Sequence, residues 1–496
     1  MTTFVSSHRR LVALLTVLIA VAFVFSFVAC DKKTVDKKSV DAEKKKPKKR
    51  LTAKEKYKKS SRERRHPVDY DTLPRDLEGF VKGVKEKMRW QKRSRYLKDA
   101  YPPAETTDVR EYLDLEMDQK LLGKSFAAGT GFLLRNQKPE GNFGYMYDWL
   151  KKEWVNDDNQ VRQAGALWGV ALCNRWDPQP KSKAALKKGL KFWFDQTIPG
   201  PEGTLTVKYQ AENNTQSGTV ALVALTIIEY LTTDTKLPAA EKKDLEDKLK
   251  GYLDFLVWMQ LDDGLVAKYY RVSSGTKATK SSPYFDGESL LALSKAANRL
   301  GYTQYVPTIE RLARAGAERY LVKAFTDRDD KNISKGFYQW SSMSYAEYYF
   351  AGWKDKEVFA DVTLILAYWM SHVHETLKRG RNHAYAIEGL ISAYRIAKAR
   401  NDTAALVDLL YVIDRSLSKL TSWQIAGPLV DRNKFLSENP TDDPVAQGGI
   451  MNAKRAYPDK PQSRGDTQHE LRIDVTQHQM HAVTLALEHV YTAEKY

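Results

Sequence analysis

Six short clusters of polar and aromatic residues recur along this chain of 496 residues. They read NDDNQVRQ (156–163), AENNTQS (211–217), SSPYFDGE (281–288), QWSSMSYAE (339–347), KRGRNHAY (378–385) and RIDVTQHQ (472–479), and each precedes or opens a run of small and apolar residues. Carboxyl, imidazole and phenol groups can transfer protons, and guanidinium groups bind carboxylates and phosphates. Helix capping and loop solvation would explain any one cluster. Six clusters in the same position predict one shared site for acid–base chemistry on an anionic ligand.

Two carboxylates have the surroundings that acid–base catalysis requires. Glu288 follows Tyr284 and Phe285, which can raise its pKa by excluding water, so we assign it as the candidate acid. Asp474 is the candidate base, with Arg472 beside it. The further catalytic candidates are Asp158, Glu347, His383 and Tyr385, with Asp286 as another substitute for the base.

Each of these carboxylates also has a structural interpretation. Asp158, Asp286 and Asp474, like Ser217, could cap helices. Glu347 and Glu388 lie inside helices, where a buried carboxylate needs a partner, and Arg162 and Arg472 are the structural partners we consider for them.

The candidate binding residues share a polar or aromatic side chain within these clusters. They are Arg162, Gln163, Asn214, Tyr284, Asp286, Trp340, Arg381, Asn382, Arg472, Gln477 and His478. The arginines would bind anionic groups on the ligand.

No motif indicates a metal ion or a cofactor. His478 and His481 are three residues apart, and His372 and His374 two apart, without a cysteine or glutamate at a zinc spacing. The stretch DRDDKN (327–332) lacks the glycine and closing glutamate of a calcium loop. We find no phosphate-binding glycine loop and no nucleophile elbow. We therefore expect neither a metal nor a cofactor.

Helices must position the clusters, because apolar residues recur at three- and four-residue spacing from about residue 100 onward. We predict twelve main helices, at about 107–136, 158–175, 181–195, 215–233, 240–261, 284–301, 304–325, 341–353, 356–377, 381–399, 403–420 and 474–494, after an outer helix near 74–98. Helices that follow a cluster, such as SGTVALVALTII, are apolar on most sides and should be buried. The alternate helices, such as AEKKDLEDKLKGYLDFLVWMQ, carry charges on one face and should lie outside.

An inner helix that alternates with an outer one six times predicts an all-α fold, the (α/α)6 toroid. The inner helices of a toroid run parallel, so their N-termini meet at one mouth. The six clusters would then form its rim, and the helix dipoles there favour anionic groups.

The body, about residues 105–496, resembles the six-hairpin glycan-active superfamily, which includes glycoside hydrolases, sugar 2-epimerases and polysaccharide lyases. The stretches FLLRNQKPEGNFGYMYD (132–148), YLDFLVWMQLDDGLVAKYY (252–270) and SPYFDGESLLALSKAANRLG (282–301) carry the likeness. The resemblance implies a glycan substrate, with aromatic side chains of the rim stacking on sugar rings. Core packing is the alternative role for those aromatics.

Three functions remain open. In an inverting hydrolase, Glu288 would protonate the leaving oxygen and Asp474 would activate water. In a uronate lyase or epimerase, as in similar toroid lyases, Arg381, Asn382, His383 and Tyr385 would neutralise the carboxylate and abstract a proton. In the third, the protein binds glycans without catalysis, as a scaffold in polysaccharide export or wall assembly.

The N-terminus has the features of an export signal: Arg9 and Arg10 precede an apolar run that extends to Ala29. The end of this run, followed by Cys30 and Asp31, resembles a bacterial lipobox, which implies a lipidated Cys30 and, in enteric-type bacteria, retention at the inner membrane. The run is also long enough to be an uncleaved spanning anchor. Both interpretations predict a protein tethered in the bacterial cell envelope, facing the periplasm or the cell exterior. Cys173 lies in an apolar helical context and is expected to be a buried thiol.

Much of the net charge of +17 lies in residues 31–70, which hold 17 Lys and Arg against 7 Asp and Glu. We expect this segment to be a disordered tether, either simply solvated or attracted to an anionic surface. Export argues against nucleic acid as a partner. The predicted organisation is a signal or anchor (1–30), the tether (31–70), a helical extension (71–104) and the toroid (105–496).

Overall fold

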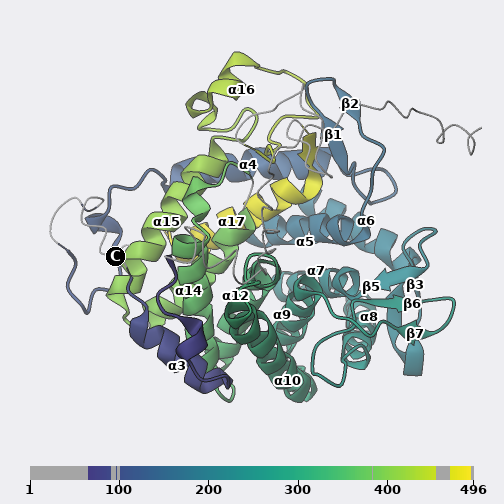
Figure 1. Ribbon diagram of the computed structural model, residues 1–496. Helices are drawn as coiled ribbons and strands as arrows, with labels where there is room; N and C mark the ends of the chain where they lie inside the picture. Colours follow the sequence, from purple (N-terminus) through teal and green to yellow (C-terminus); the bar gives the residue numbers. More distant parts are fainter. Residues whose placement is uncertain (1–64, 91–96, 98–100, 382–383, 454–469, 493–496) are drawn as a thin grey trace, which may run out of the picture. The chain divides into compact units, whose positions relative to one another are not determined.

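Six helices that are apolar on most sides form a closed inner ring in the computed structural model (Figure 1). They are α5 (Gln160–Trp176), α7 (Ser217–Thr233), α9 (Pro283–Leu300), α12 (Ile333–Ala351), α14 (Ala384–Ala399) and α17 (Ile473–His489). Each helix packs on the next, and α17 packs back on α5 to close the ring. The structure describes residues 65–90, 97, 101–381, 384–453 and 470–492, all within one compact unit, Thr52–Tyr496.

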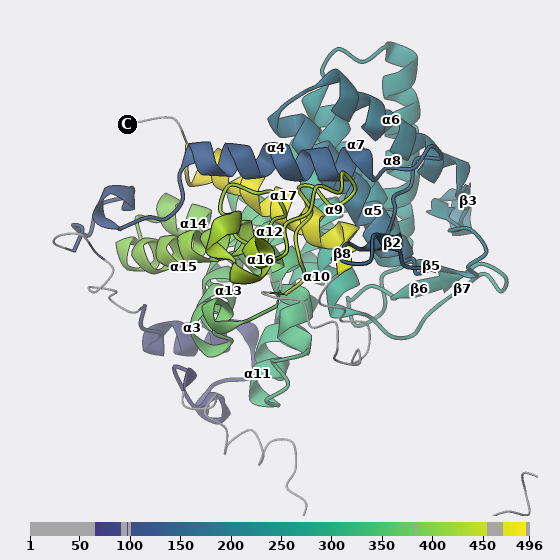
Figure 2. The ribbon, with the colours of Figure 1, turned by 90° about the horizontal axis from the view of Figure 1, so that it is seen from above.

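Six amphipathic helices surround this ring. They are α4 (Gln119–Arg135), α6 (Pro180–Asp195), α8 (Ala239–Trp258), α10 (Val306–Ala317), α13 (Lys356–Tyr368) and α15 (Thr403–Thr421). Each packs on a neighbouring inner helix, and Figure 2 shows α4 alongside α17. In α8 the side chains of Leu245, Leu249 and Leu256 face the core, whereas Lys243 and Asp247 pair in solvent. The alternation confirms the (α/α)6 toroid.

Several helix boundaries differ from the prediction. Helix α4 begins at Gln119, not 107, because Asp118 caps it by accepting a hydrogen bond from the backbone N–H of Leu121. Helix α12 begins at Ile333, eight residues before the predicted start at 341. Its N-cap residue, Asn332, makes no side-chain capping bond, so the sequence carries little signal for this start.

The predicted helices 304–325 and 356–377 are interrupted. The first continues α10 through a π-helical turn (Glu318–Lys323) into α11 (Ala324–Thr326). The second leaves α13 through another π-helical turn (Trp369–Val373). Short 3-10 turns and a five-residue helix, α16 (Lys434–Glu438), lie in the connections.

Short antiparallel strands brace the connections that lead into the inner helices. Strands β2 (Glu153–Trp154), β1 (Met146–Asp148) and β8 (Glu470–Arg472) form one sheet, and β8 leads directly into α17. A second sheet joins β5 (Asn214–Gln216), β6 (Tyr269–Arg271) and β7 (Thr276–Lys277), and β5 leads directly into α7. A hairpin of β3 (Thr197–Pro199) and β4 (Leu205–Val207) completes the set. Backbone pairing therefore fixes where two of the six inner helices begin.

The segment before the toroid differs from the prediction in two ways: part of the expected tether packs on the toroid, and the expected helix is shorter. Residues 65–70, which we assigned to the tether, pack on the toroid: Tyr70 is buried against Phe80 and Phe325, and Arg65 pairs with Glu375. The outer helix predicted at 74–98 is the shorter α3 (Leu77–Lys87).

The signal, Cys30 and the tether up to residue 64 lie outside the described residues. Within the described ranges, no helix has the length and apolarity needed to span a bilayer.

Candidate active site

A cavity of about 350 Å3 opens where the first turns of the inner helices meet. All six inner helices line it, with Arg162 from α5, Leu222 from α7, Glu288 from α9, Trp340 from α12, Tyr385 from α14 and further residues from α17. The predicted site residues that line it are Arg162, Tyr284, Glu288, Trp340, Tyr385, Arg472, Asp474, Gln477 and His478. The structure thus brings together side chains that lie up to 316 residues apart in the chain, Arg162 to His478.

Glu288 is a buried carboxyl group with no partner. It lies in the second turn of α9, is 3% exposed, and makes no side-chain hydrogen bond or ion pair within the described chain. A Cβ atom at Gly218 would lie 2.1 Å from its Oε2 atom and 2.5 Å from the Phe285 ring, so a larger residue there would force these side chains to move. Burial raises the pKa of Glu288 well above its usual range. Burial thus favours the uncharged, proton-bearing form of Glu288, which lines the cavity.

Asp474 lies in the same cavity, but its pKa is shifted in the opposite direction. The Nε and Nη2 atoms of Arg472 donate hydrogen bonds to its two oxygens at 3.1 and 2.8 Å, and Nε of Arg162 lies 3.5 Å from Oδ2. Burial alone would raise the pKa of Asp474, but the two guanidinium groups hold it below its usual value. These arginines therefore pair with Asp474, and not with Glu347, for which we had considered them.

His478 forms a second proton-transfer group on the cavity wall. Its Nδ1 atom lies 2.9 Å from Oε1 of Glu388, which is fully buried in α14. His481 lies 3.4 Å from the other oxygen of Glu388 without a hydrogen bond. Burial would raise the pKa of Glu388, but the two imidazoles lower it to about 2. Burial lowers the pKa of His478, but the Glu388 carboxylate raises it above its usual value.

Aromatic rings and cations complete the cavity. Tyr284 is 46% exposed, whereas Trp340 is buried, with its ring centre 6.1 Å from that of His478. Lys335 lies over the Tyr385 ring, 5.5 Å from its centre. The cations that line the cavity outnumber the ionised carboxylates, which favours an anionic ligand.

Other predicted site residues have structural roles at the rim. Asp158 does not cap α5; Asn159 does, and Asp158 accepts hydrogen bonds from Tyr209 and Gln163. Gln163 holds the backbone of Phe143 through both its amide atoms, at 2.8 and 2.9 Å.

Three further predicted residues are not among those that line the cavity. Asp286 is fully buried and accepts hydrogen bonds from the Val266 N–H and the Tyr320 hydroxyl. Asn214 lies in β5, beside the cavity, and Arg381 is exposed at a backbone bridge to Ala453. Asn382 and His383 lie outside the described residues.

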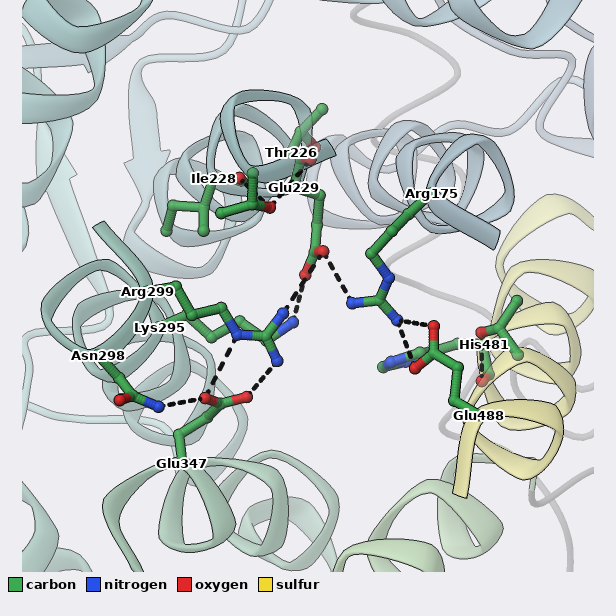
Figure 3. A network of polar contacts seen from close by, with 12 residues as sticks. Arg175, Thr226, Ile228, Glu229, Lys295, Asn298, Arg299, Glu347, His481 and Glu488 are labelled. Carbon is green, nitrogen blue, oxygen red and sulfur yellow. Dashed lines mark hydrogen bonds and ion pairs between the residues drawn. The ribbon is translucent and has the colours of Figure 1, made fainter. Parts of the chain in front are cut away.

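Glu347 was predicted to line the mouth, and the structure places it elsewhere. Helix α12 begins at Ile333, and Glu347 lies about 21 Å from Ile333 along the helix axis. There it pairs with Arg299 and accepts a hydrogen bond from Asn298 (Figure 3). The same network joins Glu229 to Lys295, Arg175 and Arg299, and Arg175 to Glu488. These residues belong to the C-terminal halves of the inner helices, so the network closes the end of the ring opposite the cavity.

Buried carboxylates should make the fold sensitive to acid. Burial raises the pKa of Glu347, but Arg299 and its neighbours lower it to about 2, close to the value of Glu388. A depressed folded-state pKa adds stability that is complete above 4.5, the unfolded value, and is lost as the pH falls from there through 2. We expect the free energy of unfolding in urea to fall between about pH 5 and pH 2.5, by on the order of 3 kcal/mol for each group. Glu347→Gln should remove one group's share, and an unchanged pH slope in that variant would contradict this assignment.

The sequence analysis missed several residues of the cavity. Lys335 and Gln339 lie on one face of the first two turns of α12, and their spacing of four residues would have indicated this had the helix start been recognised. Glu388 was noted only as a buried carboxylate, because its partner His478 is 90 residues away. Asn452 also lines the cavity, and no sequence signal marks it.

No metal centre is evident in the described part of the chain, where no three His, Cys, Asp or Glu side chains are grouped so as to hold a metal ion. Cys173 is buried, as expected from its apolar context.

No protein-family model matches the sequence, and no curated protein matches it. Solved structures do match. A GH76 alpha-mannanase of Bacteroides thetaiotaomicron is 11% identical over 73% of this chain and 94% of its own, with a TM-score of 0.50. A D-mannose isomerase is 13% identical over 78% and 100%, with a TM-score of 0.51. A cellobiose 2-epimerase of Bacillus thermoamylovorans is 10% identical over 73% and 98%, with a TM-score of 0.50. At these identities the likeness concerns the fold: this chain has the (α/α)6 toroid of these glycan-active enzymes.

Proposed function

We propose that this protein is a carbohydrate-active enzyme that hydrolyses an anionic polysaccharide of the bacterial envelope. One observation carries the proposal: two carboxyl groups of one cavity, Glu288 and Asp474, have pKa values shifted in opposite directions. Paired carboxyl groups of this kind serve as acid and base in glycosidic hydrolysis. The fold supports the proposal, because known glycan-active enzymes share it.

Each group then has a defined role. Glu288 donates its proton to the glycosidic oxygen as the bond to the anomeric carbon breaks. Asp474 accepts a proton from the water that attacks this carbon, and Arg472 keeps the carboxylate ionised and oriented. After the products leave, the proton on Asp474 returns to solvent and Glu288 is protonated again. Inversion would require the two carboxyl groups to be about 6.5–9.5 Å apart around the substrate.

The charge of the cavity supports an anionic substrate. Arg162, Arg472 and Lys335 line it, against one ionised carboxylate at its wall, Asp474. The dipoles of the inner helices add positive potential where their first turns meet. A uronate or phosphate group on the sugar would complement this potential.

A screen of the protein against bacterial envelope polysaccharides tests the proposal. New reducing ends without absorbance at 232 nm would support hydrolysis. Unsaturated products at 232 nm would identify elimination instead, and binding without any product would identify a glycan-binding protein. Either of the last two results would refute hydrolysis.

The pair of His478 and Glu388 favours a second candidate, an epimerase or lyase on the same site. A histidine held by a buried carboxylate can move a proton at a sugar carbon, and Tyr385 lines the same cavity. Exchange of a sugar C–H proton with deuterated solvent, without bond cleavage, would favour epimerisation over hydrolysis.

We also propose that the protein is tethered in the bacterial envelope through lipidated Cys30, with residues 31–64 as a basic spacer. Cys30→Ala is expected to block maturation, because the lipid is attached to the cysteine thiol. Mass spectrometry of the purified protein would report the mass of its N-terminus. An intact N-terminus at Met1 in the membrane fraction would contradict lipidation and support the spanning anchor.

A further inference from the structure

Two more hollows lie close to the cavity that holds Glu288 and Asp474. One, of about 1040 Å3, is lined by residues around β1 and β2, including Lys138, Tyr145, Trp154 and Asp158. The other, of about 490 Å3, is lined by residues around β5 and β6, including Asn214, Lys268 and Tyr269. The hollow at β1 is by itself as large as the largest typical small-ligand pockets, which have volumes of roughly 300–1,000 Å3.

The three hollows adjoin one another along the mouth of the ring. Gln216 and Phe285 line both the cavity and the hollow at β5. On the other side, the hydroxyl of Tyr145, in the hollow at β1, is bonded to Arg162 of the cavity. A chain-like ligand bound over the two carboxyl groups can therefore extend into the neighbouring hollows.

Trp154 provides an aromatic platform in the hollow at β1. It is 47% exposed, a high value for an indole ring. One side of the ring is fixed: it covers Gly144, where a Cβ atom would lie 2.2 Å from the ring, and it contacts Tyr147, with ring centres 5.0 Å apart. Backbone pairing of Tyr147 with Trp154 holds it in place. A rigid exposed ring beside a polar hollow is suited to the apolar face of a sugar.

We infer that the site binds a polysaccharide across the mouth, with sugar subsites on both flanks, and cleaves within chains. The inference rests on the proposed function for the cleavage step, but chain binding is separate from it. Trp154 and the hollow at β1 hold sugar units on one side of the scissile bond. The hollow at β5 holds units on the other side.

The test compares Trp154→Ala with Phe350→Ala, both in a Glu288→Gln background that prevents turnover. Phe350 is a matched control, because its ring is 46% exposed but lies near the opposite end of α12. The probes are alginate, hyaluronan, polygalacturonate and mannan, each as intact polymer and as its disaccharide. Binding is measured by isothermal titration calorimetry. Trp154→Phe, which keeps an aromatic ring, checks that any loss reflects stacking and not misfolding.

We expect at least one polymer to bind more tightly than its disaccharide. Trp154→Ala should weaken polymer binding about threefold to tenfold, the range given by 0.5–1.5 kcal/mol of aromatic contact. Phe350→Ala should leave it unchanged, and Trp154→Phe should restore most of it. With Glu288 intact, early products should be of intermediate length.

Other results would overturn the inference. These are equal binding of polymer and disaccharide, equal behaviour of Trp154→Ala and Phe350→Ala, no binding to any probe, or early products of only one or two sugar units. Chain-length-dependent binding without cleavage would support the subsites and refute hydrolysis. Cleavage that Trp154→Ala leaves unchanged at every length would refute the subsites and support hydrolysis.

Discussion

Glu288→Gln is expected to lower the rate of glycan cleavage by about 10²–10⁴-fold, the usual contribution of a general acid. Glutamine has nearly the same shape, but it has no proton to give to the leaving oxygen. The side chain makes no hydrogen bond or ion pair within the described chain, so the change should leave folding and glycan binding intact. Release of reducing ends would be measured together with binding of the same polysaccharide.

Asp474→Asn should cause a loss of similar size through the base. It should also weaken binding, because Arg472 and Arg162 lose the charge that orients them. Glu347→Gln is the control: it changes a carboxylate that the sequence had indicated as catalytic but that lies in the network of Figure 3. At a temperature where all variants are folded, Glu347→Gln should keep its kcat. Full activity of Glu288→Gln and Asp474→Asn would exclude the proposed pair.

Glu229→Gln is expected to destabilise the fold by about 3–5 kcal/mol, the cost of breaking a buried ion pair from one side. Glu229 is fully buried, and Arg175 at 2.9 Å, Arg299 at 3.8 Å and Lys295 all pair with it (Figure 3). Burial raises the pKa of Glu229, but these three cations lower it far below its usual value, so the carboxylate is ionised. Without it, the cations repel one another in a site that water reaches poorly.

Urea unfolding at neutral pH would measure this effect. The matched control is Asp247→Asn, which removes a solvent-exposed pair with Lys243 on α8 and should leave the stability nearly unchanged. The difference between the variants isolates the effect of burial. If Glu229→Gln were as stable as Asp247→Asn, the network would not be what closes this end of the ring.

The ring of helices is determined largely by local pattern. The run SGTVALVALTII has no charged residue on any side, whereas α8 repeats leucine at spacings of three and four residues between charged ones. Helix α7 must be surrounded by other helices on all sides, whereas α8 needs a packing partner on one face only. A toroid provides both environments. The convergence of Glu288 and Asp474 follows from the same pattern, because each stands near the N-terminus of an inner helix.

The places where inner helices begin were less predictable, and residue assignments changed with them. Helix α12 lacks a capping side chain, so nothing in the sequence marked Ile333 as its start. That shift placed Lys335 and Gln339 at the cavity and left Glu347 about two turns beyond Trp340, which also lines it. Helix α5 begins at Gln160, two residues after the predicted start at 158, and its cap is Asn159 in place of Asp158.

The chemical state of each group was decided by tertiary structure alone. A sequence gives no distance between Arg162 and Asp474, or between Glu388 and His478, because such pairs are 312 and 90 residues apart. Whether a carboxyl group is protonated depends on the charges and the water around it after folding. Glu288 and Glu388 are both glutamates near the start of apolar inner helices, but one has no counter-charge and the other has two imidazoles. The residue types and their order thus determined the toroid and its mouth, and packing between distant helices determined which carboxyl group can give a proton there.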